Sequence, residues 1–454
     1  MSEKEASDFT KSYTAIFSFF YLVQGLYNGL QTIVLPIYLI TVIDGVDLAY
    51  ILIILSAATL PWALKFLIGM INDKYGFKKI GRRKPWIFVF GIWGGIWFII
   101  TGALLPTQLG LETISLLNLV GVLAVMWNIG WAVADTALDG LILDVTPKEK
   151  LGKVQGLTWS MNLFGSSALG ILMGALIFMY DLFTFFFILE GILFFVAAVL
   201  PFLIKESEVP EDVHVWRDFI NIIKKGRNLK LFISSLLDHI PYAVVTIAFA
   251  LFVIIYWPVK LVDIDVTSIS LAAESIDLLI IFTIFGAISG VGVIGGSILT
   301  GVISDKNRRK GIYFAHVIYI PTIILCVFLS GVFFAGIIAI LLSILMAILI
   351  GIGEGGLSTS FQAVRGDFAK LYPETDSTYY ALVISCLNGG HSLGYIIAGG
   401  LLLLLSGVFT EFWVIFLIVM IIMTVIQLSA LGIFLTLDPS DYEFKKHLQG
   451  EKNE

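Results

Sequence analysis

The stretch Gly69-Met70-Ile71-Asn72-Asp73-Lys74 occurs a second time, slightly altered, about half the chain later. The second copy reads Gly301-Val302-Ile303-Ser304-Asp305-Lys306 in a chain of 454 residues. Each copy ends a long apolar segment and is followed by Arg-Arg-Lys, at 82–84 and at 308–310. Internal repeats of this kind in a membrane protein predict two related halves with a binding site between them.

The composition is that of an integral membrane protein. Hydrophobic residues make up 58% of the chain, charged residues 14%, and the mean hydropathy is +0.96, which excludes an ordinary soluble domain. The two cysteines, Cys326 and Cys386, lie in apolar runs and indicate no disulfide framework. Nucleotide loops, zinc-spaced ligand sets and nucleophile elbows are absent from the sequence. We therefore expect no enzyme activity, no cofactor, no metal and no nucleic-acid partner.

Apolar segments of about 20 residues each predict transmembrane helices. There are twelve such segments, at 13–40, 49–71, 85–105, 114–143, 153–179, 182–204, 231–257, 276–303, 311–330, 332–361, 379–405 and 411–436. All but two of the 28 Lys and Arg residues lie at the termini, in the loops that follow even-numbered segments, or at the bordering segment ends. The positive-inside rule then predicts that both termini are cytoplasmic. We expect a monomer in the plasma membrane, surrounded by lipid.

The longest polar interruption separates the two halves. It predicts an N-terminal six-helix bundle at 1–204, a cytoplasmic linker at 205–230, a C-terminal six-helix bundle at 231–438 and a cytoplasmic tail at 439–454. Within the linker, Val215, Phe219 and Ile223 recur at helical spacing, which predicts an amphipathic helix on the lipid headgroups. A flexible linker is the alternative.

The repeated Gly-x-x-x-Asp-Lys with its basic run resembles the loops between helices two and three, and eight and nine, of the major facilitator superfamily. The resemblance implies an all-α integral membrane fold, with twelve transmembrane helices in two pseudo-symmetric six-helix bundles around a central cavity. It also implies a gating role for the repeated residues. These are Gly69, Asp73, Arg82, Arg83, Gly301, Asp305, Arg308 and Arg309.

Three stretches narrow the resemblance to one branch. The extended Gly-Arg-Arg-Lys loop at 81–84 is similar to that of sugar:cation symporters, muropeptide permeases and acetyl-CoA transporters. Leu60-Pro61-Trp62-Ala63-Leu64-Lys65 and Asp135-Thr136-Ala137-Leu138-Asp139-Gly140 are similar to stretches in helices two and four of the last two groups. Ala134 and Leu141 depart from that pattern, so the resemblance implies the class and not the substrate.

Ionisable groups inside membrane spans are costly and mark candidate functional sites. Lys65 and Asp135 lie at similar depths in spans that run in the same direction, so we expect them to be in contact. A buried ion pair that only positions helices is the alternative. Glu190 is interpreted as structural, because the sixth span packs peripherally in the superfamily that the chain resembles. The candidate proton-coupling residues are Asp135, Asp139, Asp238, Glu354 and His391.

Uncharged polar residues also share helix faces. Gln24, Asn28 and Gln31 are spaced i, i+4, i+7 in the first span and predict a substrate wall, with interhelical hydrogen bonding as the alternative. The candidate substrate-binding residues are Gln24, Asn28, Gln31, Lys65, Trp159, Asn162 and Asn388.

The sequence predicts a secondary transporter that works by alternating access. A lysine at cavity depth favours a small solute with an anionic group, and isolated carboxylates favour coupling to protons over Na⁺. The alternatives are a sugar or glycoside:cation symporter, and a non-transporting assembly or lipid-handling protein on the same fold.

Overall fold

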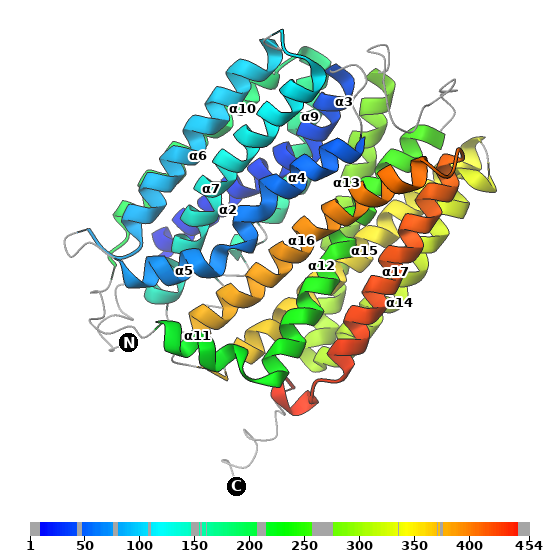
Figure 1. Ribbon diagram of the computed structural model, residues 1–454. Coiled ribbons are helices and arrows are strands. Elements are labelled where there is room, and N and C mark those ends of the chain that lie inside the picture. The colour runs from blue at the N-terminus through cyan, green and yellow to red at the C-terminus, as the bar shows by residue number, and fades with distance from the viewer. Residues whose placement is uncertain are drawn as a thin grey trace.

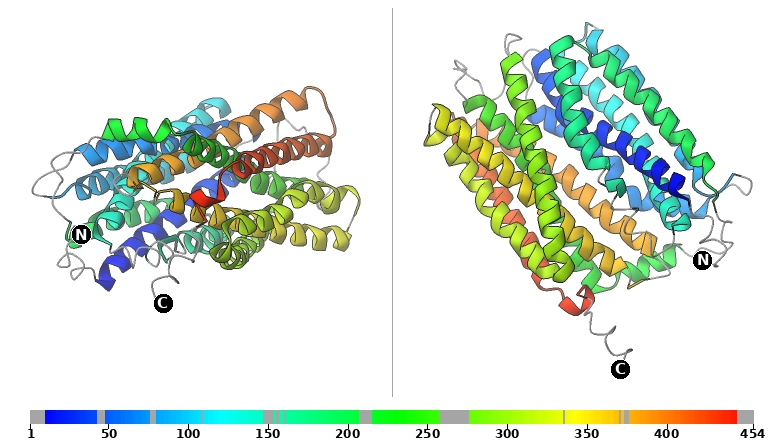
Figure 2. Two further views of the ribbon diagram at one scale, coloured as in Figure 1. Left: turned by 90° about the horizontal axis from the view of Figure 1, so that it is seen from below. Right: turned by 180° about the vertical axis from the view of Figure 1, so that it is seen from behind.

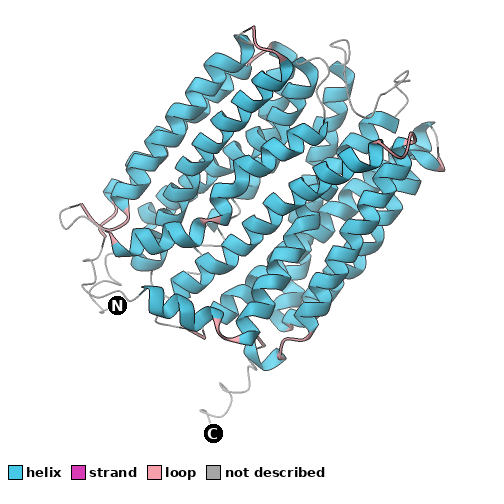
Figure 3. Cartoon of the chain, in the orientation of Figure 1, coloured by secondary structure: helices cyan, strands magenta, loops and turns pink. Residues whose placement is uncertain are grey.

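The computed structural model consists almost wholly of helices, and the described residues contain no strand (Figure 3). Membrane-spanning backbone must satisfy its own hydrogen bonds, which a helix does within one segment. The described residues are 10–42, 48–75, 80–107, 110–146, 154, 157–159, 161–206, 215–256, 276–334, 336–369, 371–372 and 376–443.

The helices form two bundles that lie side by side (Figures 1 and 2). The first contains α2 (Lys11–Gly29), η1 (Leu30–Val34), α3 (Leu35–Val42), α4 (Leu48–Ala63), α5 (Lys65–Lys74), α6 (Lys84–Leu104), α7 (Thr113–Val145), η3 (Phe164–Leu169), α9 (Gly170–Tyr180), α10 (Phe183–Val199) and η4 (Leu200–Leu203). The second contains α12 (Gly226–Tyr256), α13 (Ile276–Lys306), α14 (Arg308–Val327), η5 (Phe328–Val332), α15 (Gly336–Ala369), α16 (Asp376–Ser406), α17 (Phe412–Leu435) and η6 (Pro439–Asp441). Between the bundles in sequence lies the helix α11 (Val215–Ile223), whereas the cytoplasmic position of the linker on the lipid headgroups stays a prediction.

Nine helical stretches in the described part of the chain are long and apolar enough to cross a membrane. The predicted spans at 13–40, 153–179 and 231–257 fall outside this set, and for them the count of twelve stays a prediction. The predicted boundary at residue 331, between the spans 311–330 and 332–361, is wrong, because Gly331 lies inside the π-helical η5 and the chain leaves the helix at Phe333. A π turn accommodates one extra residue without ending the helix.

The tenth span is longer than the sequence predicted. Its expected end was residue 361, but α15 runs to Ala369 and carries Arg365 into the protein interior, where the side chain is fully buried. The predicted span ended too early because hydropathy falls at the charged residues Arg365 and Asp367. Both side chains form ion pairs, and the helix continues through them.

The repeated stretch makes the same contacts in both bundles. A Cβ atom at Gly69 would lie 3.5 Å from Thr136 on α7, and one at Gly301 would lie 3.6 Å from Thr359 on α15. Both distances are ordinary van der Waals contacts, so the two glycines occupy matching positions in the two halves and an alanine would fit at either.

The basic runs that follow are anchored in matching ways. The Arg82 guanidinium pairs with Asp144 on α7 at 2.8 Å, and the Arg308 guanidinium pairs with Asp367 on α15 at 2.9 Å. Arg83 also contacts Asp144, at 3.2 Å. We call this end of the two bundles the basic end. The side chains of Asp73 and Asp305 lie outside the described residues, so their gating role stays a prediction.

Each bundle is closed at the basic end by a glutamate that follows its last helix. Glu206 Oε1 accepts hydrogen bonds from the backbone N–H groups of Arg82, at 2.8 Å, and Arg83, at 2.7 Å. Glu443 accepts one from the backbone N–H of Arg309, at 3.1 Å, and one from Asn307 Nδ2, at 2.9 Å. We call these two arrangements the carboxylate clasps. In each clasp the carboxylate accepts hydrogen bonds from N–H groups at the start of a helix, which have no acceptor within the helix itself.

The two bundles meet where α16 lies along α4 and α5, and again where α13 contacts α9 and η3. We call the contact of α16 with α4 and α5 the seam. Polar contacts cross this seam at three levels of α16. Ser385 Oγ accepts from the Phe66 backbone N–H at 2.8 Å, Asn388 Nδ2 donates to the Trp62 carbonyl at 3.2 Å, and Ser392 Oγ bonds Thr59 Oγ1 at 2.8 Å. At the basic end α11 contacts both α5 and α16, and Phe219 stacks on Phe66 with ring centroids 5.7 Å apart.

Replacing Ser385 by alanine should loosen this seam. The change removes one hydrogen bond worth about 1 kcal/mol and leaves the Phe66 N–H without its acceptor. With Ala381→Cys as the reporter in a Cys326→Ser/Cys386→Ser background, we expect maleimide labelling at position 381 to become about fivefold faster. Ser406→Ala is the control, because that hydroxyl bonds only to its own helix, at the Leu403 carbonyl. Equal labelling of Ser385→Ala and the control would show that this bond does not hold the seam.

Candidate functional site: a buried ion-pair cluster beside the seam

The candidate site begins at a break in the second predicted span. The sequence predicted one helix over 49–71, but α4 ends at Ala63, Leu64 forms a turn, and α5 begins at Lys65. Pro61 has no backbone N–H and so weakens the helix just before the break. Broken membrane helices expose backbone groups next to a binding site. The break places Lys65 at the first residue of α5, facing α7.

Lys65 is paired with two carboxylates one helical turn apart on α7. Its ammonium group bonds the Asp135 carboxylate, and lies 3.2 Å from Asp139 Oδ2. The side chains of Lys65 and Asp135 are each 4% exposed, whereas that of Asp139 is 32% exposed. The Tyr21 hydroxyl of α2 donates to Asp139. The contact predicted between Lys65 and Asp135 is confirmed, and Asp139 is the member of the cluster that reaches solvent.

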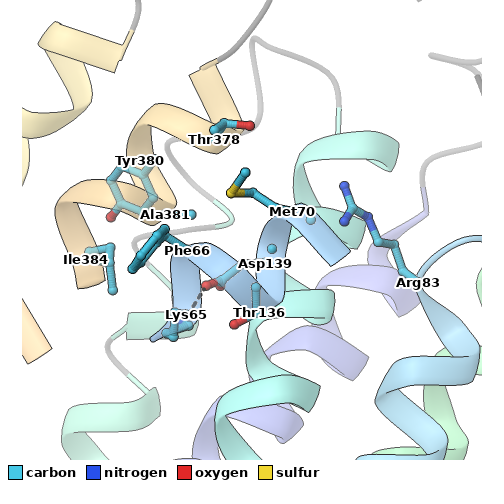
Figure 4. Close-up of a pocket in the computed structure, with 12 residues that line it drawn as sticks. Lys65, Phe66, Met70, Arg83, Thr136, Asp139, Thr378, Tyr380, Ala381 and Ile384 are labelled. Atoms are coloured by element: carbon cyan, nitrogen blue, oxygen red, sulfur yellow. Dashed lines mark hydrogen bonds and ion pairs between the residues drawn. The ribbon is translucent and has the colours of Figure 1, made fainter. Parts of the chain in front are cut away.

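A small pocket opens onto this cluster (Figure 4). It is lined by α5 and α7 of the first bundle, by Arg83 just before α6, and by α16 of the second bundle. The lining residues are Lys65, Phe66, Gly69, Met70, Arg83, Thr136, Asp139, Gly140, Thr378, Tyr380, Ala381 and Ile384. Because Thr378 and Arg83 belong to the basic end, a solute entering there would pass between the bundles and meet Asp139.

A network of amides and aromatic rings lies on the other side of Lys65. Gln31 Oε1 accepts from Tyr27, Trp127 and Asn128 at 3.0, 2.8 and 2.6 Å. Trp62 Nε1 donates to Asn128 Oδ1 at 2.7 Å, and Lys65 Nζ lies 5.4 Å from the centre of the Trp62 ring. The side-chain oxygen of Gln31 is thus already occupied by donors of the first bundle.

The other predicted substrate residues lie at different distances from the cluster. Asn162 Nδ2 donates to Gln24 Oε1 at 3.0 Å. The exposed Trp159 ring lies 6.1 Å from the ring of Tyr21, which bonds Asp139. Asn28 is half-buried on α2, and Asn388 is engaged at the seam. Their substrate-binding role stays a prediction.

Sequence reasoning missed Tyr21, Asn128 and Tyr380. Tyr21 extends the spacing of Gln24, Asn28 and Gln31 by one more turn, so the same periodicity could have revealed it. Asn128 and Tyr380 carry no comparable signal.

A second buried cluster lies within the other bundle. Asp238 on α12 accepts from Gln427 Nε2 at 2.8 Å, and Arg365 Nη2 lies 3.5 Å from its other oxygen. Arg365 also donates to Ser235 Oγ at 3.1 Å. The Asp238 and Arg365 side chains are 3% and 0% exposed. Arg365 was assigned to a loop by sequence and is the missed partner of Asp238.

The remaining candidate proton-coupling residues also lie in the second bundle. His391 Nε2 is 3.0 Å from the Tyr395 hydroxyl, on the next turn of α16. Glu354 is buried on α15. Their roles stay predictions.

The comparison with known protein families decides the class of the chain. The model of the Major Facilitator Superfamily matches residues 17–375. The chain belongs to this superfamily. Together with its apolar helices, this makes it a multi-pass integral membrane protein.

One curated relative shows a moderate similarity in sequence. The chain is 28% identical over 290 residues to the putative transporter AmpG 1 of Rickettsia conorii (strain ATCC VR-613 / Malish 7). The match covers 61% of the chain and 66% of the relative, which is just under two thirds of that protein.

Two solved structures share the superfamily fold. The nucleoside transporter NupG has a TM-score of 0.64 and 13% identity over 93% of this chain and 100% of its own. A bacterial homolog of the human lysosomal transporter Spinster, inward-facing and occupied, has a TM-score of 0.59 and 14% identity over 96% of this chain and 97% of its own. These likenesses confirm the all-helical fold of two bundles.

Proposed function

We propose that this protein is a secondary active transporter that moves a small solute with an anionic group by alternating access, in symport with protons. The observation that supports this most is the Lys65–Asp135–Asp139 cluster at the inner end of a pocket between the two bundles. The superfamily and the names of the relatives, which are transporters, support a transport function. The charged groups of the cluster support the anionic solute and the coupling to protons.

The charge of the cluster links the proton to the solute. One ammonium and two carboxylates sum to a single negative charge, which repels an anionic solute. Protonation of the partly exposed Asp139 would remove that charge and free one N–H of Lys65. Lys65 could then donate to the anionic group of the solute while Asp135 keeps the ammonium paired. Proton and solute would therefore enter together.

Among the candidate coupling residues, we propose Asp139 and Asp135 ahead of Asp238, Glu354 and His391. Asp139 lines the pocket, whereas Asp238 is enclosed in the second bundle by Arg365 and Gln427. A buried, multiply bonded ion pair of that kind is suited to fixing helix positions.

We further propose that the basic end faces the cytoplasm. Arginines of both halves gather there, and the positive-inside rule assigns such an end to the cytoplasm. These are Arg82, Arg83, Arg227, Arg308 and Arg309. The first described helix begins there and the last one ends there (Figure 1), so both termini would be cytoplasmic. The pocket then opens inward in this conformation. We propose a monomer in the plasma membrane.

The test begins with a thermal-shift screen of the purified protein against anionic metabolites, nucleosides and sugars, because a bound ligand raises apparent stability. The labelled hit is then offered to proteoliposomes with and without a pH gradient. We expect accumulation that a protonophore abolishes. Asp139→Asn should lose gradient-driven accumulation and keep solute exchange, because a permanently neutral side chain mimics the protonated state.

Asp181→Asn, at the end of α9, is the matched control and should accumulate solute normally. Uptake by the wild type that ignores the gradient would overturn proton coupling. Full coupling in Asp139→Asn would move the proton site elsewhere. A neutral sugar as the hit would favour the sugar-symporter alternative, and failure of every solute would favour the lipid-handling one.

A further inference from the structure

One carboxyl group of the first bundle has no partner. Glu190 lies near the middle of α10 and its side chain is fully buried. Neither of its carboxyl oxygens has a hydrogen-bond partner in the described structure. A structural role, as the sequence suggested, would require a group for the carboxyl to bind. Nothing of that kind reaches Glu190, and a leucine would pack there at lower cost.

Aromatic rings enclose this position from one side. Phe187 and Phe194 lie three residues before and four residues after Glu190, and so share its face of α10. Phe98 of α6 stacks against both rings, at 5.0 and 5.6 Å between centroids. A Cβ atom on the adjacent Gly191 would lie 2.6 Å from the Gly95 carbonyl of α6. The packing leaves no room for solvent along this face.

The first predicted span covers the position from the other side. Tyr27 of α2 contacts Phe194 at 6.2 Å, and Tyr38 of α3 stacks on Phe183 at 3.9 Å. The two segments run in opposite directions between these contacts, which brings Glu190 level with η1. The π turn η1 spans Leu30–Val34 and contains Gln31 of the amide network. π turns are rare and are found frequently at functional sites.

No cation faces Glu190 from the elements packed against α10. Between its first residue, Lys84, and its end, α6 carries no titratable side chain. α2 carries Tyr13, Tyr21 and Tyr27, with Lys11 at its distant start, and α3 presents Tyr38. α7, whose Trp127 and Trp131 contact Phe187 and Phe194, carries three carboxylates and no cation. α9 carries only Tyr180, at its end, and η4 carries none.

An ionised carboxylate in such surroundings would have neither water nor a counter-ion, so the group must be neutral. We propose that Glu190 is a proton-binding site, which holds a proton in this conformation and exchanges it during the transport cycle. The proposal rests on the proposed proton-coupled transport and adds a second proton site to it. The O–H bond forms here, and in another conformation its proton passes to water.

The movable element beside the site is η1. If its π turn reverted to α-helical geometry, the residues beyond it would rotate by roughly 100° about the helix axis, because one residue would leave the turn. Gln31 lies in that turn and is joined through Asn128 and Trp62 to Lys65. A change at the pocket could thus alter the surroundings of Glu190.

Infrared spectroscopy of the full-length protein tests the proposal without any solute. We expect a C=O stretching band of a protonated carboxylic acid at neutral pH. The band should shift when the protein is grown with ¹³C-carboxyl glutamate, disappear in Glu190→Gln, and persist in the control Glu206→Gln. It should also shift slowly after transfer to D₂O, as the proton exchanges.

A wild-type spectrum without a glutamate-dependent band would overturn the proposal, and so would a band that survives Glu190→Gln. A band that never shifts in D₂O would overturn the exchange. If Glu190→Gln fails to fold, the isotope experiment is repeated in Glu354→Gln, which removes the other buried candidate glutamate and should leave the band in place. Because no solute is involved, the result is independent of the uptake assays: failed transport with a normal band would count against the proposed function alone.

Discussion

Gly355→Ala is expected to abolish the accumulation of folded protein in the membrane. α13 and α15 cross with their backbones almost in contact, and a Cβ atom at Gly355 would lie 2.1 Å from the Val293 carbonyl oxygen. Both partners at this point are backbone, so no side chain can move aside. Lipid supplies no hydrophobic force between helices, so their association depends on such close packing. Fluorescence size-exclusion chromatography of a tagged protein measures the outcome.

Gly295→Ala is the matched control. Gly295 lies on α13 beside Gly296, but a Cβ atom there would have no neighbour within 4 Å, whereas one at Gly296 would lie 2.2 Å from the Ile352 carbonyl oxygen. We expect the control to give a normal monodisperse peak. A normal peak from Gly355→Ala would show that the two helices can separate without loss of the fold.

Lys65→Met is expected to abolish transport and to lower the free energy of unfolding by roughly 3–5 kcal/mol, the range found when one partner of a buried ion pair is removed. The loss arises because Asp135, at 4% side-chain exposure, would lose its counter-ion and would have either to stay charged while buried or to take up a proton, and both cost free energy. Thermal unfolding in detergent and uptake in proteoliposomes measure the two effects.

The double variant Lys65→Met/Asp135→Leu separates stability from function. It should recover most of the lost stability, because well-packed apolar residues replace the ion pair. It should still fail to transport, because the solute has lost its cation. Recovered transport would instead show that the pair only positions α5 and α7. Unchanged stability in Lys65→Met would contradict the ion pair itself.

The fold was largely predictable because it follows from properties that the sequence shows directly. Apolar segment length predicts the helices, and the repeat at Gly69 and Gly301 predicts two like bundles. Depth along the helices was enough to predict the contact between Lys65 and Asp135. All three arguments use only the positions of residues along the sequence.

The rest depends on which helix faces meet, and spacing does not determine that. Hydropathy ends a span at its first charge, so the burial of Arg365 against Asp238 was invisible. The break at Leu64 is stabilised by the neighbouring α16, because Ser385 accepts the hydrogen bond from the Phe66 N–H at the break. Spacing along the sequence does not show that α16 lies there. The isolation of Glu190 is also a property of its neighbours, because it depends on every facing side chain being apolar or aromatic.

The carboxylate clasps have a consequence for synthesis of the chain. Glu206 follows the last helix of the first bundle and ties that end back to Arg82 and Arg83, far earlier in the sequence. All residues needed for this closure are synthesised before α12, the first helix of the second bundle, begins at Gly226. Chains grow at roughly 5–20 residues per second, which gives the first bundle many seconds to fold alone. The nascent chain can therefore fold in two steps, and Glu443 completes the second step after the last helix of the second bundle has formed.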